Sequence, residues 1–132
     1  MSVEFVVQLE NHPGAVAAFA HELAEHGIEI RSIVGGGLGK LGYAILATDD
    51  AAAARDVLGK SGHQFAEGHP LLVELEDRPG ALARVAERLA DAGIAIGGLT
   101  VVGRSGDIIE VAITTSDADG ARRALGLELA EI

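Results

Sequence analysis

The chain contains the sequence LENHPGAVAAFAHELAEHGIEI at residues 9–30 and a copy of it, LEDRPGALARVAERLADAGIAI, at residues 75–96. The copies align without a gap at an offset of 75 − 9 = 66 residues, and 12 of their 22 positions are identical. A repeat of this length indicates two copies of one supersecondary unit. The sequence therefore predicts two small domains, residues 1–68 and residues 69–132.

Each copy is expected to fold as strand, helix, strand, strand, helix, strand. Apolar residues alternate along both first strands, and they follow the i, i+3, i+4, i+7 spacing of a buried helix face in the segments after Pro13 and Pro79. Both prolines are expected in the first turn of their helix. Gly27 and Gly93 are expected to end these helices. This order predicts an α+β fold of two ferredoxin-like βαββαβ domains, with antiparallel sheets and helices on one face, packed as a pseudo-twofold pair.

The remaining elements are predicted from the same patterns, with glycine-rich turns inside the two hairpins. Hairpin strands are expected at residues 28–34 with 41–48 and 94–102 with 107–114, second helices at 51–58 and 118–125, and last strands at 63–66 and 127–130. A unit of about 65 residues is only marginally stable alone. We therefore expect the two copies to pack together and the chain to form a homodimer.

The charge and composition of the chain exclude several classes of protein. Ten Lys and Arg stand against 20 Asp and Glu, a net charge of −10, which disfavours nucleic acid and anionic membranes as partners. There is no Cys, so disulfides and thiolate metal sites are excluded. The N-terminus has no signal-peptide pattern, and the longest uncharged stretch, residues 92–103, is shorter than the roughly 20 residues of a membrane-spanning helix. We expect a cytoplasmic protein.

The segment between the first strand and the first helix of each copy has the chemistry to bind a zwitterion. A helix N-terminus carries free N–H groups and partial positive charge, and Gly14 or Gly80 leaves the backbone accessible to a carboxylate. Asn11 and Asp77 offer oxygen atoms that accept hydrogen bonds from an ammonium group. The alternative is that Asn11 and Asp77 only cap the helices.

Residues 11–16 (NHPGAV) and 77–82 (DRPGAL), each leaving an apolar strand and opening a helix that ends before Gly-Ile-x-Ile, resemble the signature of the ACT domain family. The resemblance covers both halves of the chain. It implies a regulatory protein of amino-acid metabolism, without catalytic activity or cofactor. In this family paired domains hold an amino acid where the strand-helix loop of one domain faces the second strand of its neighbour.

The resemblance also implies which residues bind the ligand. They are Asn11, His12, Pro13, Gly14, Ala15, Val16, Ser32 and Ile33 in the first copy, and Asp77, Arg78, Pro79, Gly80, Ala81, Leu82, Leu99 and Thr100 in the second. One copy is able to bind while the other is structural, and the pair Asp77 and Arg78 makes the second copy the more polar candidate.

Three functions follow from these observations. The first is a free-standing sensor of a small molecule, most simply an amino acid. The second is a regulatory subunit that docks on an amino-acid biosynthetic enzyme and confers feedback control. The third, a catalyst of ferredoxin-like shape, would need an acid-base or nucleophile set that the sequence does not display.

Two further motifs are better explained by structure than by chemistry. Residues 34–41 (VGGGLGKL) lack the G-x-x-x-x-G-K spacing and the Ser or Thr of a phosphate-binding loop, so a hairpin turn is expected there. The five His residues do not have the i, i+4 spacing of a zinc site. No metal is expected, and His12 beside the motif is the one histidine that we expect to have a role.

Overall fold

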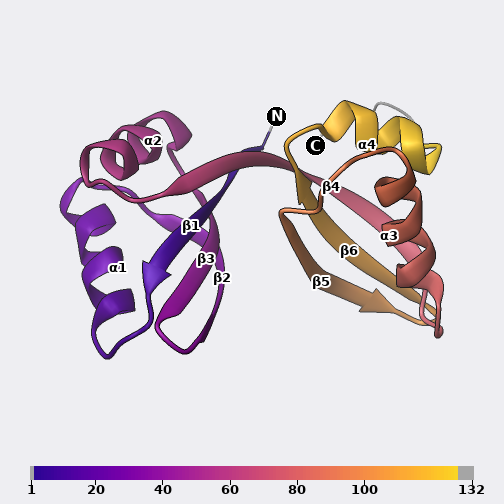
Figure 1. The fold of residues 1–132 in the computed structure, drawn as a ribbon, viewed down its shortest axis with the longest axis horizontal. Helices are drawn as coiled ribbons and strands as arrows, with labels where there is room; N and C mark the ends of the chain where they lie inside the picture. Colours follow the sequence, from indigo (N-terminus) through magenta and orange to yellow (C-terminus); the bar gives the residue numbers. More distant parts are fainter. Residues whose placement is uncertain (1, 128–132) are drawn as a thin grey trace. The chain divides into compact units, whose positions relative to one another are not determined.

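The structure is a computed structural model that describes residues 2–127. Its elements follow one another in the predicted order, as Figure 1 shows. They are β1 (Glu4–Glu10), α1 (Ala15–Glu25), β2 (Ile30–Leu38), β3 (Leu41–Thr48), α2 (Ala51–Lys60), β4 (Phe65–Glu76), α3 (Ala81–Asp91), β5 (Gly98–Ser105), β6 (Ile108–Thr115) and α4 (Ala118–Leu125). The last strand predicted for the second copy, residues 127–130, lies outside the described residues except for Leu127.

The chain forms two compact units. The first is Val3–Glu67, and the second contains Ser2 and the chain from Gly68 onward. Strand β4 belongs to both, because its first three residues lie in the first unit and the rest in the second.

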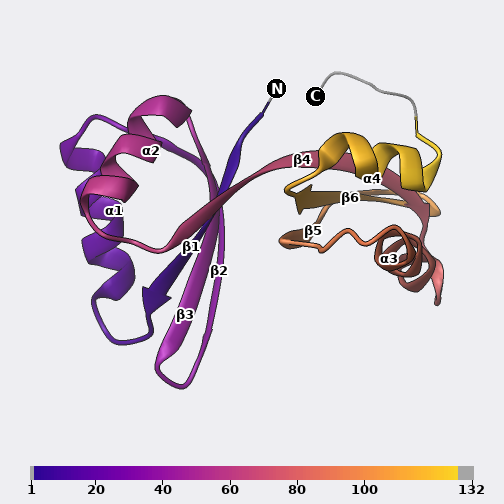
Figure 2. The ribbon, with the colours of Figure 1, turned by 45° about the horizontal axis from the view of Figure 1, so that its top comes forward.

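In the first unit the strands are hydrogen-bonded in the order β2-β3-β1-β4, and α1 and α2 cover one face of this sheet (Figures 1 and 2). The alternation predicted for β1 holds, since Phe5 and Val7 are fully buried under the helices. They pack with Phe19 and Leu23 of α1 and Leu58 of α2.

The second unit repeats this layering with β4, β6 and β5 in that order and with α3 and α4 on one face. Its core contains Leu71 and Val73 of β4, Val111 and Ile113 of β6, and Leu89 of α3. Each unit thus has its own hydrophobic core, and the α+β architecture predicted from the repeat is confirmed.

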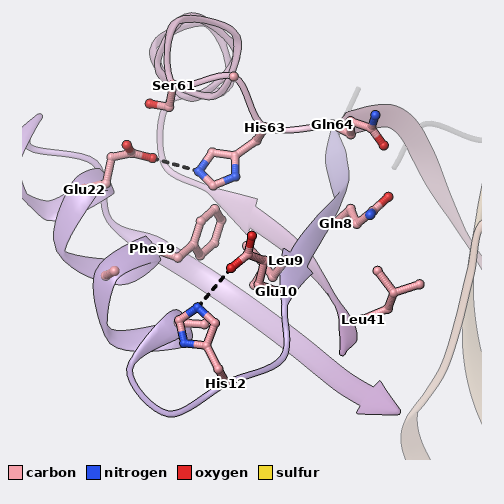
Figure 3. A pocket seen from close by; sticks show the side chains of 13 residues that line it. Gln8, Leu9, Glu10, His12, Phe19, Glu22, Leu41, Ser61, His63 and Gln64 are labelled. Carbon is pink, nitrogen blue, oxygen red and sulfur yellow. Dashed lines mark hydrogen bonds and ion pairs between the residues drawn. The ribbon is translucent and has the colours of Figure 1, made fainter. Parts of the chain in front are cut away.

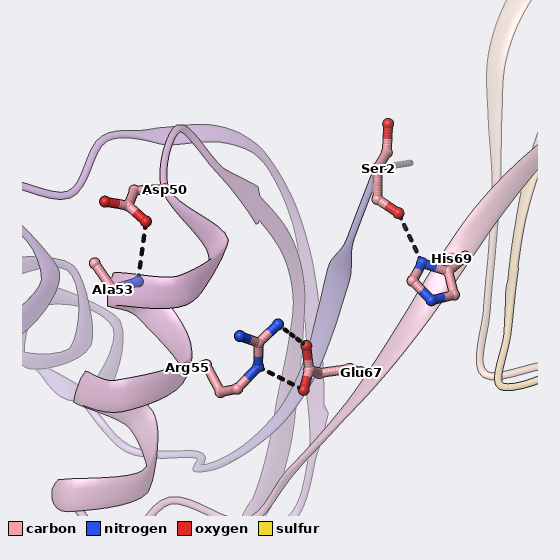
Figure 4. Close-up of polar contacts among 6 residues, drawn as sticks. All are labelled: Ser2, Asp50, Ala53, Arg55, Glu67 and His69. Carbon is pink, nitrogen blue, oxygen red and sulfur yellow. Dashed lines mark hydrogen bonds and ion pairs between the residues drawn. The ribbon is translucent and has the colours of Figure 1, made fainter. Parts of the chain in front are cut away.

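Strand β4 corrects the prediction that the last strand of the first copy, residues 63–66, is separate from the first strand of the second copy. It runs without interruption for 12 residues. Gly68 does not form a turn, because it allows the backbone to approach β6: a Cβ atom there would lie 2.5 Å from Thr114 Cγ2. Figure 4 shows that Glu67 of β4 accepts two hydrogen bonds from Arg55 of α2, at 2.8 and 2.6 Å.

The second strands also start and end later than predicted. Gly27 and Gly93 have φ angles of 70° and 75° and end the preceding helices as expected. The chain then needs several residues to reach the sheet, so β2 begins at Ile30 and β5 at Gly98. The glycines predicted to form the first hairpin turn lie inside β2, where Gly35, Gly36 and Gly37 pair with Ala44, Tyr43 and Gly42.

Candidate functional site

The connection from β1 to α1 places a glycine immediately before the helix. Gly14 has a φ angle of 90°, a left-handed conformation that favours glycine, and α1 starts at Ala15. The second copy is the same at Gly80, which also has a φ angle of 90°. The prediction that Pro13 and Pro79 lie in the first helical turn is therefore wrong, because the glycine conformation separates each proline from its helix.

Asn11 and Asp77 do not cap the helices, so the capping alternative is also wrong. The Asn11 side-chain amide donates to the carbonyl oxygen of Gly39 at 2.9 Å, and its backbone N–H donates to that of Lys40 at 3.0 Å. Asn11 is therefore held against the turn between β2 and β3. In the second copy the carboxylate of Asp77 accepts a hydrogen bond from Arg104 of β5.

His12 has a hydrogen-bond acceptor at both ring nitrogens. Nδ1 lies 3.0 Å from the carbonyl oxygen of Pro13, and Nε2 lies 3.2 Å from Glu10 Oε2. Since both contacts require a proton on the ring nitrogen, they favour the imidazolium form. The Pro13 carbonyl, and then Glu10, raise the pKa of His12 above its usual value. The second copy has a permanent charge at the same place, where Arg78 Nε lies 2.6 Å from Glu76 Oε2.

A pocket of about 450 Å³ lies in the first unit between the start of α1 and strands β2 and β3. It is lined by Leu9, Glu10, Asn11, His12, Ala15, Val16, Phe19, Ile33, Gly35, Gly36, Gly37, Gly42, Tyr43 and Ala44. Five predicted site residues are among them: Asn11, His12, Ala15, Val16 and Ile33. The structure thus brings the β1–α1 connection and β2 of one unit together, whereas the family resemblance implies a site shared by two neighbouring domains.

The other predicted residues of the first copy lie near this pocket without lining it. Pro13 and Gly14 are exposed in the connection, and Ser32 pairs with Ala47 on the strand face opposite to that of Ile33. The sequence prediction missed Phe19 and the small strand residues. The three consecutive glycines were the available signal, but we assigned them to a turn.

A second pocket, of about 480 Å³, faces the connection between α2 and β4 (Figure 3). It shares His12 and Phe19 with the first pocket. On its far wall His63 Nε2 lies 3.1 Å from Glu22 Oε1, and the His63 ring meets the Phe19 ring edge-on at 5.5 Å between centroids. Two histidine-carboxylate pairs therefore line this pocket. Among residues 2–127, no three His or acidic side chains are placed to hold a metal ion.

The second copy places its predicted residues differently. Asp77, Arg78, Pro79 and Gly80 are exposed in the connection, Ala81 is buried, and Leu82, Leu99 and Thr100 are at least partly exposed. Arg78 and Ala81 line a pocket of about 490 Å³ over α3 together with Arg84, Arg88 and Glu87. This pocket corresponds to the one that faces the α2–β4 connection in the first unit, because its Glu74, Arg84 and Arg88 are the repeat positions of Gln8, Ala18 and Glu22, which line that pocket but not the 450 Å³ pocket.

The strand positions that line the 450 Å³ pocket have larger residues in the second copy. Val101 pairs with Val111 as Gly35 pairs with Ala44, and Ile109 takes the position of Gly42.

Among the described residues, no helix has the length and hydrophobicity needed to cross a membrane.

The two units define an α+β chain with the tandem ACT fold, in which the described residues have the order βαββαβ in the first unit and βαββα in the second. A protein of known structure from Bacteroides thetaiotaomicron, BT0572, is similar over 95% of this chain and 86% of its own, with 20% identity and a TM-score of 0.63. The regulatory subunit of aspartate kinase from Thermus flavus is similar over 96% and 95%, with 20% identity and a TM-score of 0.59. Its counterpart from Thermus thermophilus, in a ligand-free form, is similar over 95% and 91%, with 18% identity and a TM-score of 0.55. A scan against protein-family models gives no match, and no curated protein matches the sequence.

Proposed function

We propose that this protein is a non-catalytic regulatory sensor that binds an amino acid in the first unit. The observation that supports this function is the 450 Å³ pocket, which is of the size that small-molecule sites have. It has polar groups at the start of α1 and apolar or small residues elsewhere. This combination suits a small molecule with a charged head and a compact body.

The head of the ligand would bind where β1 joins α1. A carboxylate is attracted by the N-terminus of α1 and by the imidazolium of His12. An ammonium group is attracted by Glu10 and can donate a hydrogen bond to the Asn11 side-chain oxygen. Because the His12 and Glu10 side chains are already paired at 3.2 Å, a zwitterion can interact with both charges without leaving either unpaired.

A thermal-shift screen of the twenty amino acids tests this function. A ligand present at a hundred times its dissociation constant and bound only by the folded state adds about 2.7 kcal/mol of stability, which raises the melting temperature by several degrees. The decarboxylated amine and the deaminated acid of the same compound should each stabilise the protein much less. Equal stabilisation by the amino acid and its amine would contradict a carboxylate site at α1.

A second candidate function is that of a subunit that docks on an amino-acid biosynthetic enzyme. It is supported by the likeness to two Thermus proteins described as regulatory subunits of aspartate kinase. Size-exclusion chromatography with light scattering tests this function and the expected homodimer together. The purified chain is measured alone and mixed with the aspartate kinase catalytic chain of the same organism. A mixture that elutes as two unchanged species would count against docking on that enzyme.

A further inference from the structure

We infer that the amino acid bound by the first unit has an uncharged, apolar side chain, which lies on a floor made of Gly35, Gly42 and Ala44. We call these three residues the glycine floor. This inference rests on the proposed function, because it concerns the side chain of the ligand that the pocket would bind. It also assigns binding to one repeat of the two.

The strand register shows that the glycine floor faces the helices. Gly35 pairs with Ala44, which is 2% exposed in the core, and Ala44 pairs in turn with the fully buried Val7. Directly paired residues project to the same side of a sheet. Gly37 and Gly42 form the next such row, with Leu9. Asn11 lies over Gly37, where a Cβ atom would be 2.7 Å from Asn11 Cγ. The glycine floor replaces larger side chains that would otherwise fill the rest of the space beneath the first turns of α1.

The walls of the pocket are apolar. Phe19 is 3% exposed and belongs to the core, whereas Val16 and Ile33 are 64% and 45% exposed at the pocket. A ligand side chain that covered Val16 and Ile33 would remove apolar surface from water, at about 25 cal/mol per Å². Both residues are therefore placed to gain from contact with an apolar ligand.

The charges of the pocket do not suit a charged ligand side chain. Of the described residues that line it, only Glu10 and His12 carry charge, and they lie at the same end and are paired with each other. A lysine, arginine, aspartate or glutamate ligand would place its side-chain charge over the glycine floor, where no further charged side chain among the described residues lines the pocket. A charge that loses part of its hydration without a partner is costly, so these amino acids are expected to bind less tightly than an apolar one.

The second repeat provides the internal comparison. Val101, Ile109 and Val111 stand where the first unit has Gly35, Gly42 and Ala44. Arg104 also reaches across to Asp77 and adds a long side chain at the position of Gly37. The same backbone therefore offers a ligand side chain less room in the second copy than in the first.

Isothermal titration with leucine, alanine, lysine and glutamate tests the inference in the full chain. Leucine should bind at least ten times more tightly than lysine or glutamate. Gly35→Val introduces the residue of the second repeat and should weaken leucine binding about tenfold or more while alanine affinity changes less than about twofold, since each methylene in a pocket is worth about 10- to 200-fold. A Cβ atom at Gly35 would lie 3.2 Å from the Tyr43 carbonyl oxygen, a tight contact. If Gly35→Val does not fold for this reason, Ala44→Val serves as the second variant.

Gly103→Val is the matched control, because it lies on β5 and its Cβ atom would be an ordinary 3.7 Å from Glu110 Cβ. It should keep the wild-type ratio of leucine to alanine affinity. Binding of charged amino acids as tightly as leucine, or an unchanged ratio in both floor variants, would overturn the inference and leave the proposed function standing. Failure of every amino acid to bind would overturn both.

Discussion

The side chain of Asn11 lies against Gly37 so closely that a Cβ atom at position 37 would be 2.7 Å from Asn11 Cγ. Gly37 of β2 thus leaves room for the side chain of Asn11, the residue that directly follows β1. Asn11 in turn fastens the start of α1 to the β2–β3 turn through Gly39. One edge of the pocket therefore depends on the Asn11 side chain and on the lack of a side chain at Gly37.

Gly37→Ala should displace Asn11 and break its hydrogen bond to Gly39. We expect a loss of about 1 kcal/mol in the free energy of unfolding, the usual value of one such bond, and weaker amino-acid binding. Urea unfolding and calorimetric titration measure the two effects. Gly103→Ala is the control, since a Cβ atom there meets Glu110 at an ordinary 3.7 Å; a similar loss in both variants would show that Asn11 is not responsible.

Gly14→Ala and Gly80→Ala should destabilise the protein equally but affect binding differently. Both glycines have a φ angle of 90°, and a Cβ atom would meet no clash at either. The strain of a left-handed alanine costs about 1–2 kcal/mol at each site. If the first unit is the one that binds, only Gly14→Ala should also weaken ligand binding, by adding a methyl group at the start of α1. Equal weakening by both variants would point to a site in each copy.

The sequence predicted the fold well because the fold depends on patterns that repeat. Two aligned copies, alternation in the first strands and helical spacing behind them identified nearly every described element. The boundaries that failed have local causes. The repeat predicts a break between the copies at Gly68, but this glycine allows close packing on Thr114 inside β4. The three glycines of β2 predict a turn, although only Gly39 and Lys40 lie between the paired strands.

The site was less predictable than the fold. The motif located the β1–α1 connection, but the partners of Asn11, His12 and Asp77 depend on strand register, which the sequence pattern does not determine. The polar pair Asp77 and Arg78 made the second copy the more attractive candidate. Their neighbours Arg104 and Glu76 pair with these charges, as Glu10 pairs with His12 in the first copy. The first copy is favoured instead by its small strand residues Gly35, Gly42 and Ala44.

Amino-acid binding should weaken as the pH rises through the pKa of His12. That pKa is raised in the folded protein, first by the Pro13 carbonyl and then by Glu10. The His12 imidazolium is therefore retained above the unfolded pKa of about 6.5. Its contribution to the stability of the folded protein is complete below that value and is lost as the pH rises through the higher folded pKa. Titration at pH 5.5 to 8.5 measures the effect on binding.

His12→Arg is the informative variant for this pH dependence, since the second copy has Arg78 at the same position beside Glu76. It should bind the ligand with a nearly flat pH profile. In wild type, the His12 ring protons followed by NMR should titrate above the usual pKa. Glu10→Gln should lower that pKa only part of the way, because the Pro13 carbonyl remains. A pH dependence unchanged by His12→Arg would assign it to another group.

Arg55 and Arg122 occupy the same repeat position and should respond oppositely to replacement by Met. Arg55 is half-exposed and forms two hydrogen bonds to Glu67, so Arg55→Met should lower the free energy of unfolding slightly. Arg122 is 4% exposed, and within residues 2–127 its Nη2 has no hydrogen-bond partner. Arg122→Met should therefore be neutral or stabilising in urea unfolding. Arg122 Nη1 lies 3.4 Å from Asp119 Oδ1. A loss of about 3 kcal/mol would show instead that this ion pair outweighs the cost of burying the charge.

Strand β4 makes the two halves of the chain thermodynamically dependent on each other. There is no linker to cut, because the residues that complete the first sheet continue directly into the second. Unfolding of either half would break backbone hydrogen bonds of β4, on which the sheet of the other half also depends. Although the chain has two hydrophobic cores, calorimetry should record a single cooperative transition, and a fragment ended at residue 67 should be far less stable than half of the whole.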